Sequence, residues 1–309
     1  MAPWLKLASI LTSLSTERFV SDLLSLPQVR CRDPVSLTQR LQIIKNDGHN
    51  NLAVLSDFDY TLSKAYASNG EYLWSTLGVF RNFFPEEPRF KLIALYNRCI
   101  LIENDSNMSY DDKLPFMRQC ALEAHKIYFS TGITRNLIRQ WSLMAKIQLR
   151  DGTKSWSEYL EEKDIPMLIF SAGVTDIIEV IVQKELSKIP KNLRVISNAL
   201  VYDDLGKSSA FKPPLIHIFN KNVSTIEQEE SPLIKSFLNH KNVLLMGDNL
   251  ADLYMGKQEN SQGATLKIGF FNNDFGTVLE RYLEGFDIVL IEDETMEIPT
   301  LLTKFLVEK

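Results

Sequence analysis

Short, uninterrupted runs of branched apolar residues constrain this chain more than any other feature. Runs of this kind are typical of strands that are buried on both faces of a sheet. Helical patterns lie between most of the runs, for example over residues 175–187 and 275–284. Strands that alternate with helices predict a parallel sheet covered by helices on both faces. The five runs span residues 52–55, 165–170, 193–196, 243–246 and 288–291.

The interval between the first two runs breaks this alternation. It contains helical patterns but no convincing strand pattern. A helical block of this length exceeds a simple crossover, so we expect an inserted helical cap domain over residues 63–158, with an α/β core made of residues 1–62 and 159–309. The helical patterns span residues 88–102, 110–128 and 135–149.

Composition excludes several classes of partner. The 309 residues carry a net charge of −5, so there is no basic surface to predict binding to nucleic acid or to an acidic membrane. No apolar run is long enough to predict a membrane span. The three cysteines are widely spaced and odd in number, which argues against a disulfide framework and favours a reducing compartment. We interpret the first 15 residues as a surface helix or a frayed end rather than a targeting signal.

Two carboxylates follow the first predicted strand. Asp57 and Asp59 stand where residues 52–55 would end, and ligands of open α/β sheets bind beyond the carboxyl ends of the strands. Two aspartates at this spacing also begin ordinary turns. The pattern alone therefore leaves a turn and a ligand site as alternatives.

The later strand ends favour the ligand site. Ser171-Ala172-Gly173 follows the second run, and a hydroxyl with backbone amides at a strand-to-helix turn suits a phosphate oxygen. Asp248 and Asp252 follow the fourth run, and Lys221 lies between the two segments. Each has an ordinary alternative: Ser171 or Asp248 as a helix cap, and Lys221 as a surface lysine. Clustered carboxylates repel unless a cation neutralises them, however, and hard oxygen ligands suit Mg²⁺.

These residues resemble the four motifs of the haloacid dehalogenase superfamily of phosphatases. Longer stretches are similar to the type III cytosolic 5′-nucleotidases, which include pyrimidine-specific and 7-methylguanosine-phosphate-specific enzymes. The similarity runs from about residue 29 to the C-terminus. It implies a Rossmann-like parallel sheet core with an inserted helical cap domain. The stretches are SDFDYTLSK (56–64), IPMLIFSAG (165–173), LIHIFNK (215–221) and LKIG (266–269).

The resemblance assigns the catalytic roles. Asp57 would be the nucleophile that forms an aspartyl-phosphate. Asp59 would be the general acid that protonates the departing ribose oxygen and then, as a base, activates water. Mg²⁺ would be held by the Asp57 carboxylate, the Asp59 main-chain carbonyl and Asp248, with Asp252 supporting the metal site. Ser171, the Ala172 amide and Lys221 would bind the phosphoryl group.

The resemblance also assigns Glu103 to the base of the substrate. Its alternative is a solvated acid at a helix end. The chain then departs from the family pattern, because Cys120 stands where the family has a tryptophan and Ala124 where it has a substrate-binding serine. Tyr72 or Trp74 could stack on a base instead, although such aromatic residues more often belong to a cap core.

We therefore expect a cytoplasmic, monomeric enzyme that hydrolyses nucleoside 5′-monophosphates, pyrimidine nucleotides or 7-methylguanosine 5′-monophosphate, with Mg²⁺. A phosphotransferase that uses the same residues and a nucleoside acceptor is one alternative. A non-catalytic nucleotide-binding protein is another, but the presence of Asp57, Asp59, Lys221 and Asp248 argues against it.

Overall fold

The computed structural model describes residues 14–103, 105, 107–227, 231–256, 263–272 and 278–308. Most of the first 15 residues, for which we expected a surface helix or a frayed end, lie outside the described residues. No described helix has the length and apolar character needed to cross a membrane.

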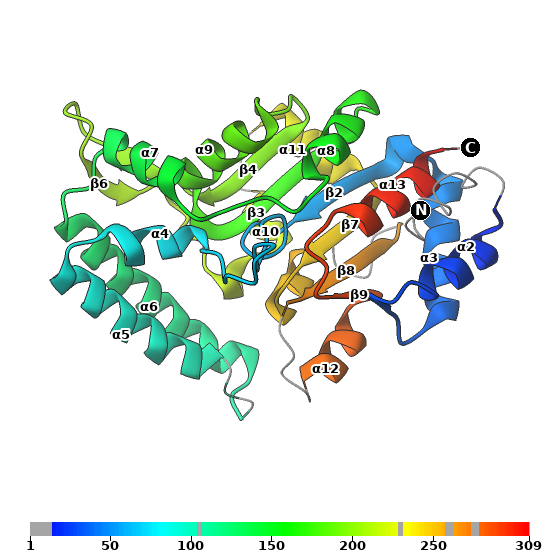
Figure 1. Cartoon of the computed structure of the whole chain (residues 1–309), viewed down its shortest axis with the longest axis horizontal. Helices are drawn as coiled ribbons and strands as arrows, with labels where there is room; N and C mark the ends of the chain where they lie inside the picture. The colour runs from blue at the N-terminus through cyan, green and yellow to red at the C-terminus, as the bar shows by residue number, and fades with distance from the viewer. Residues whose placement is uncertain are drawn as a thin grey trace.

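A seven-stranded sheet forms the centre of the molecule (Figure 1). Its order is β1-β9-β8-β7-β2-β3-β4, and every neighbouring pair is parallel except β1 with β9. The predicted parallel α/β sheet is therefore confirmed. The strands are β1 Val29–Arg30, β2 Leu52–Ser56, β3 Met167–Val174, β4 Leu193–Asn198, β7 Asn242–Gly247, β8 Thr265–Phe271 and β9 Ile288–Ile291.

The order of the strands creates a switch point beside β2. The chain runs from β2 to β3 and β4 on one side, and then returns to place β7, β8 and β9 on the other side. Crossover helices consequently leave in opposite directions from the carboxyl ends of β2 and β7. A crevice opens at such a point in parallel sheets.

Alternate residues of β2 pack into two separate cores, which explains why its sequence is continuously apolar. Leu52 and Val54 join one cluster, whereas Ala53 and Leu55 join the other. The first cluster is covered by α2 Thr16–Leu24, α3 Pro34–Asp47, α8 Thr153–Glu162, α9 Thr175–Leu186 and α13 Glu297–Val307. The second is covered by α10 Val223–Ile226, α11 Pro232–Asn239 and α12 Val278–Gly285.

The segment between β2 and β3 is helical, and no named strand occurs in its described part. Two long helices, α5 and α6, pack against each other at one end of the molecule (Figure 1). Helix α7 packs on the core helix α9, and α8 is anchored to α13 by a buried hydrogen bond from Trp156 to Thr303. The predicted cap boundary at residue 158 falls inside α8. The helices are α4 Thr76–Phe83, α5 Glu86–Glu103, α6 Tyr110–Ser130 and α7 Arg135–Met144.

Several elements differ from the predictions. β1 and β8 were not predicted, because β1 has two residues and the apolar pattern of β8 is interrupted by Lys267 and Gly269. The helix predicted over residues 135–149 ends at Met144, and the chain then becomes extended, with Leu149 bridging to Ser63. By contrast, the turn signal Asp203-Asp204-Leu205-Gly206 predicts a small hairpin over residues 198–212, and this prediction is confirmed. The hairpin consists of the antiparallel strands β5 Leu200–Tyr202 and β6 Ser208–Phe211.

The prediction that the cysteines form no disulfide is wrong. Cys99 of α5 and Cys120 of α6 are bonded, and Cys31 is the free cysteine. The two bonded residues are 21 positions apart in the sequence, but the antiparallel packing of the helices brings their Cα atoms within 6.3 Å. An odd count of cysteines excludes complete pairing, not a single pair.

A buried guanidinium fixes the loop that follows β2. Arg150 donates to the carbonyls of Thr61 and Tyr60, each at 2.7 Å, and pairs with Glu294 at 3.1 Å. Glu294 in turn accepts hydrogen bonds from the amides of Ala65 and Tyr66. The loop after β2 is thereby tied to the segment after β9.

Replacement of Arg150 by methionine should lower the free energy of unfolding by about 3 kcal/mol, because it leaves Glu294 and two loop carbonyls without their buried partner. Urea denaturation would measure this. Arg98→Met is a matched control, since Arg98 forms an exposed pair with Glu123 and its loss should cost less than about 1 kcal/mol. Equal costs for the two variants would contradict the role assigned to Arg150.

Candidate functional site

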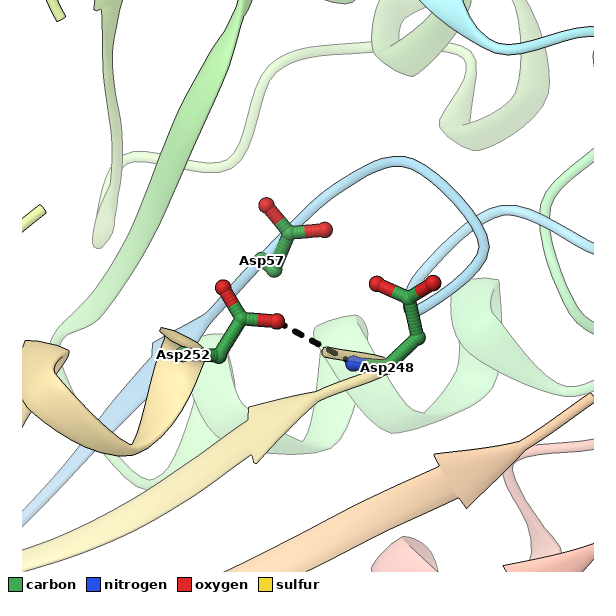
Figure 2. A group of neighbouring side chains, drawn as sticks. All are labelled: Asp57, Asp248 and Asp252. Carbon is green, nitrogen blue, oxygen red and sulfur yellow. Dashed lines mark hydrogen bonds between the residues drawn. The ribbon is translucent and has the colours of Figure 1, made fainter. Parts of the chain in front are cut away.

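The carboxyl ends of β2 and β7 bring three carboxylates together. Asp57 follows β2 directly, and its amide donates to the carbonyl of Met246 in β7 at 3.0 Å. Asp248 follows β7, and Asp252 lies in the short helix η4 (Leu250–Met255). Carboxylate oxygens from the three aspartates lie within 4.8 Å of one another (Figure 2).

Asp252 is held in place by the backbone around it. Its Oδ2 accepts from the amides of Asp248 at 3.2 Å and Asn249 at 3.1 Å, and Figure 2 shows the first of these bonds. A Cβ atom on Gly247 would lie 2.4 Å from the Asp252 side chain, so glycine permits this close approach. Asp252 therefore has little freedom to move.

Lys221 bridges two of the carboxylates. Its Nζ donates to Asp57 Oδ1 at 2.5 Å and to Asp252 Oδ1 at 2.7 Å. Burial raises the pKa of Asp57 to about 7, although the charge of Lys221 opposes this. Burial acts to lower the pKa of Lys221, but the charges of Asp252 and Asp57 outweigh it and raise that pKa. The lysine consequently stays cationic inside the cluster.

Asp248, the third carboxylate, adds to the negative charge of the cluster. Burial, with the charge of Asp57 as the next cause, raises the pKa of Asp248 well above its ordinary value. Three carboxylates share one buried lysine cation in this part of the described chain, so a second cation would stabilise their ionised forms. Their hard oxygen atoms suit a divalent cation such as Mg²⁺, and the cluster fits a metal site.

Asp59 is held by a different partner, Thr76, at the start of α4. Asp59 accepts hydrogen bonds from the Thr76 amide at 2.7 Å and from its hydroxyl at 2.6 Å. Burial raises the pKa of Asp59 to about 6, against the effect of these bonds. A Cβ atom on Gly173 would lie 2.2 Å from Thr76 Oγ1, so a glycine after Ser171-Ala172 is needed for Thr76 to reach this position.

Ser171 lies on the neighbouring strand. Ser56 pairs with Ile169, so the parallel register places Ser171 one residue beyond the level of Asp57. The Ser171 hydroxyl is buried and accepts from the Gly173 amide at 3.0 Å. Of the residues predicted as a phosphate site, Ser171 and Ala172 thus occupy the strand beside Asp57, and Lys221 contacts Asp57 directly.

A largely apolar cavity of about 270 Å³ adjoins the site. Ala172 lines it, and so does Glu103 at the end of α5. Glu103 Oε1 accepts from Asn249 at 3.1 Å, which connects α5 to the loop that carries Asp248. Burial raises the pKa of Glu103, with the bond from Asn249 opposing it.

The wall of the cavity contains the two residues at which the chain departs from the family pattern. Cys120 and Ala124 both line it, and so does His125, whose pKa burial lowers to about 4. Tyr72 and Trp74 are not among the residues found to line the cavity. Trp74 packs edge-on against Phe83 and lies against the first core, as expected for an aromatic residue of a cap core. Tyr72 contacts Tyr60 and Tyr66 but is exposed, so it fits neither alternative.

Sequence reasoning missed Thr76, Asn249 and Arg150, which fix Asp59, Glu103 and the loop after β2. Asn249 had a local signal, because it adjoins Asp248. Thr76 had a weaker signal as a possible helix start after Ser75. Arg150 had none, because its partners lie about 90 and 144 positions away.

The sequence matches the family model described as pyrimidine 5′-nucleotidase (UMPH-1) over residues 60–307. A putative cytosolic 5′-nucleotidase 3 of Caenorhabditis elegans is 35% identical over 281 residues, which cover 89% of this chain and 74% of the relative. The 7-methylguanosine phosphate-specific 5′-nucleotidase A of Xenopus laevis is 33% identical over 283 residues, covering 91% of this chain and 96% of the relative.

Solved structures show the same fold. The crystal structure of cytosolic 5′-nucleotidase IIIB bound to cytidine matches with a TM-score of 0.81 and 27% identity, covering 92% of this chain and 95% of the other. A haloacid dehalogenase family hydrolase from Salmonella enterica matches with a TM-score of 0.52 and 14% identity over 82% of this chain and 72% of the other. The predicted haloacid dehalogenase-type α/β core is confirmed by these likenesses.

The raised pKa of Asp57 predicts that this carboxylate destabilises the metal-free protein as pH rises. Its pKa is about 7 in the folded protein against an ordinary value of 3.8, so the folded state binds more protons. The Asp57 carboxyl group therefore stabilises the folded state most at low pH, and this stabilisation is lost as pH rises to about 7. In chelator, Asp57→Asn should melt at a higher temperature than the wild type at pH 8, and the difference should shrink towards pH 5. A constant difference between pH 5 and 8 would contradict this.

Proposed function

The chain belongs to the pyrimidine 5′-nucleotidase family and is an enzyme of the 5′-nucleotidase class, and from this premise we propose that it hydrolyses nucleoside 5′-monophosphates with Mg²⁺ through an aspartyl-phosphate on Asp57. The observation that carries the proposal is the buried arrangement of Asp57, Lys221 and two further carboxylates beside a cavity of about 270 Å³. A phosphate would sit at the charged end and a nucleoside in the cavity, whose volume approaches that of small-molecule sites.

Asp57 is the proposed nucleophile. It attacks phosphorus in line with the ester bond, which breaks as the aspartyl-phosphate forms. Lys221 already contacts its Oδ1 and holds the carboxylate in one orientation. The same ammonium, with the Ser171 hydroxyl and the Ala172 amide, would bind the oxygens of the phosphoryl group. This fixed positive charge offsets the negative charge of the transition state.

Asp59 is the proposed general acid and base. A carboxyl group with a pKa of about 6 carries a proton in part of the population near neutral pH, as a general acid needs. It gives this proton to the departing ribose oxygen. The resulting carboxylate then takes a proton from the water that attacks the aspartyl-phosphate, which regenerates Asp57. Thr76 fixes both of its oxygens and so sets the direction of proton transfer.

The carboxylates of Asp57 and Asp248 and the main-chain carbonyl of Asp59 would hold Mg²⁺. When bound, the ion offsets the charge of the carboxylates and the phosphate. Asp252 would support this set without leaving its own partners, because Lys221 and two backbone amides already occupy its oxygens. Through these contacts, Asp252 keeps Lys221 and the loop after β7 in place relative to Asp57.

The base would occupy the cavity beside Glu103. The relative from Xenopus laevis is named for 7-methylguanosine phosphate, the family model for pyrimidine nucleotides, and the related crystal structure contains cytidine. We propose both classes of substrate for this chain. Glu103 would accept a hydrogen bond from the base or attract the positive charge of a methylated purine. The name of the Caenorhabditis elegans relative supports a cytosolic location. We also propose that residues 63–158 act as the cap domain, because α5 carries Glu103 to the wall of the cavity.

Phosphate release from UMP, CMP, GMP, AMP and 7-methyl-GMP would test this function. We expect release from pyrimidine nucleotides or 7-methyl-GMP with Mg²⁺ and none with chelator. Asp57→Asn should lower turnover at least about a thousand-fold, because it removes the nucleophile. Its folding, measured by circular dichroism, should be intact. Comparable turnover by the wild type and Asp57→Asn would refute the assignment of the nucleophile.

Thr76→Val tests the positioning of Asp59. Valine keeps the shape of threonine but loses the hydrogen bond to Asp59 Oδ2, so kcat should fall about 10- to 100-fold with little change in KM. Steady-state kinetics at several pH values would measure both constants. Thr76→Ser restores the hydroxyl and should recover most of kcat. Equal activities of the valine and serine variants would contradict the role of the hydroxyl.

A further inference from the structure

The disulfide between Cys99 and Cys120 lies in the wall of the cavity beside the carboxylate cluster. Both cysteines line this cavity, and each is 7% exposed. One belongs to α5 and the other to α6, so the bond joins two helices that form the wall. The two cysteines therefore form part of the wall that a nucleoside would contact.

Helix geometry connects the bond to the rest of the wall. On α5, Tyr96 and Glu103 lie three and four positions from Cys99, so the three share a helix face. On α6, Ala124 lies four positions from Cys120, again on one face. All five residues line the cavity. A change in the separation of the helices at the disulfide would therefore move Glu103 relative to Ala124.

The polar links described between these helices are individually weaker than the disulfide. The hydroxyls of Tyr96 and Tyr128 are hydrogen-bonded, and Lys113 donates to the Glu103 carbonyl at 2.7 Å. The ion pair between Arg98 of α5 and Glu123 of α6 is exposed to solvent and therefore contributes little. Loss of the disulfide would leave the wall held mainly by side-chain packing.

We propose that the Cys99–Cys120 disulfide sets the affinity of the nucleoside pocket, and that thiol–disulfide exchange at this bond switches the pocket between a tight and a loose form. The inference rests on the proposed function, because it requires the cavity to hold the nucleoside. The switch acts on binding and leaves the phosphoryl chemistry at Asp57 unchanged. Cys120 stands where the family has a tryptophan, and it therefore provides a covalent link between the helices in place of an aromatic contact.

The disulfide can exchange in both directions. A dithiol reductant attacks one sulfur of the bond, forms a mixed disulfide and is released as its own cyclic disulfide, while Cys99 and Cys120 each gain a proton. In the reverse direction, one cysteine thiolate attacks glutathione disulfide and expels one glutathione. The second cysteine then displaces the other glutathione and closes the bond. Each direction transfers two electrons.

Reduction should loosen the pocket for a physical reason. Two thiol sulfurs in van der Waals contact lie about 1.5 Å farther apart than two bonded sulfurs, so α5 and α6 must separate or shift. The wall also gains conformational freedom that binding has to remove. Both effects weaken binding of the nucleoside. A bound nucleoside should in turn cover the sulfurs and slow their reduction.

The test compares the full-length protein after treatment with glutathione disulfide and after treatment with dithiothreitol. Titration of thiols in denaturant should give at most one thiol per chain in the first state, that of Cys31, and three in the second. The nucleotide KM should rise about 3- to 10-fold on reduction, whereas kcat should change less than about 2-fold. Calorimetry with the matching nucleoside should show the same loss of affinity without turnover. Saturating nucleoside should slow the appearance of thiols.

Two variants separate the disulfide from other thiol effects. Cys31→Ser removes the free cysteine and should keep the full response to reduction. The double variant Cys99→Ser with Cys120→Ser should bind the nucleoside like the reduced wild type and should not respond to reductant. If this double variant fails to fold, the comparison of the oxidised and reduced wild type still tests the inference. Equal KM and equal nucleoside affinity in the two redox states would overturn this inference but leave the proposed function standing. Absence of both turnover and nucleoside binding in both states would overturn the inference and the proposed function together.

Discussion

Lys221 holds two buried carboxylates at the switch point of the sheet, beside β2, and the rest of the site is arranged around this contact. Its ammonium contacts Asp57 from the end of β2 and Asp252 from η4. Burial of these anions is costly without a cation nearby, because low-dielectric surroundings favour the neutral carboxyl form. The lysine therefore determines which conformation the loops after β2 and β7 can adopt. It also leaves the cluster with excess negative charge, which a divalent cation would offset.

Much of the fold could be predicted because its main signal is local. Residues 52–55 are continuously apolar since alternate side chains enter two different cores, and this pattern is visible without any tertiary information. Parallel strands also place their carboxyl ends at one edge. Residues at the ends of separate strands, such as Asp57, Ser171 and Asp248, could therefore be expected to lie together, and they do.

The remaining features depend on contacts between distant segments. Arg150 and Glu294 hold the loop after β2 from positions far along the chain, and no local pattern distinguishes them from ordinary surface charges. Cys99 and Cys120 meet because α5 and α6 fold back on each other. β8 was missed because a lysine and a glycine interrupt a strand that is nevertheless central in the sheet. Spacing along the sequence carries none of this information.

The central claim is that Asp57 forms a covalent bond to the phosphoryl group of a nucleotide. The most direct measurement is to quench the enzyme during turnover with Mg²⁺ and nucleotide, reduce it with borohydride, and analyse its peptides by mass spectrometry. Borohydride converts an aspartyl-phosphate to homoserine, so the account predicts homoserine at position 57 when nucleotide is present and aspartate when it is absent. Release of phosphate with unmodified aspartate at position 57 would contradict the account.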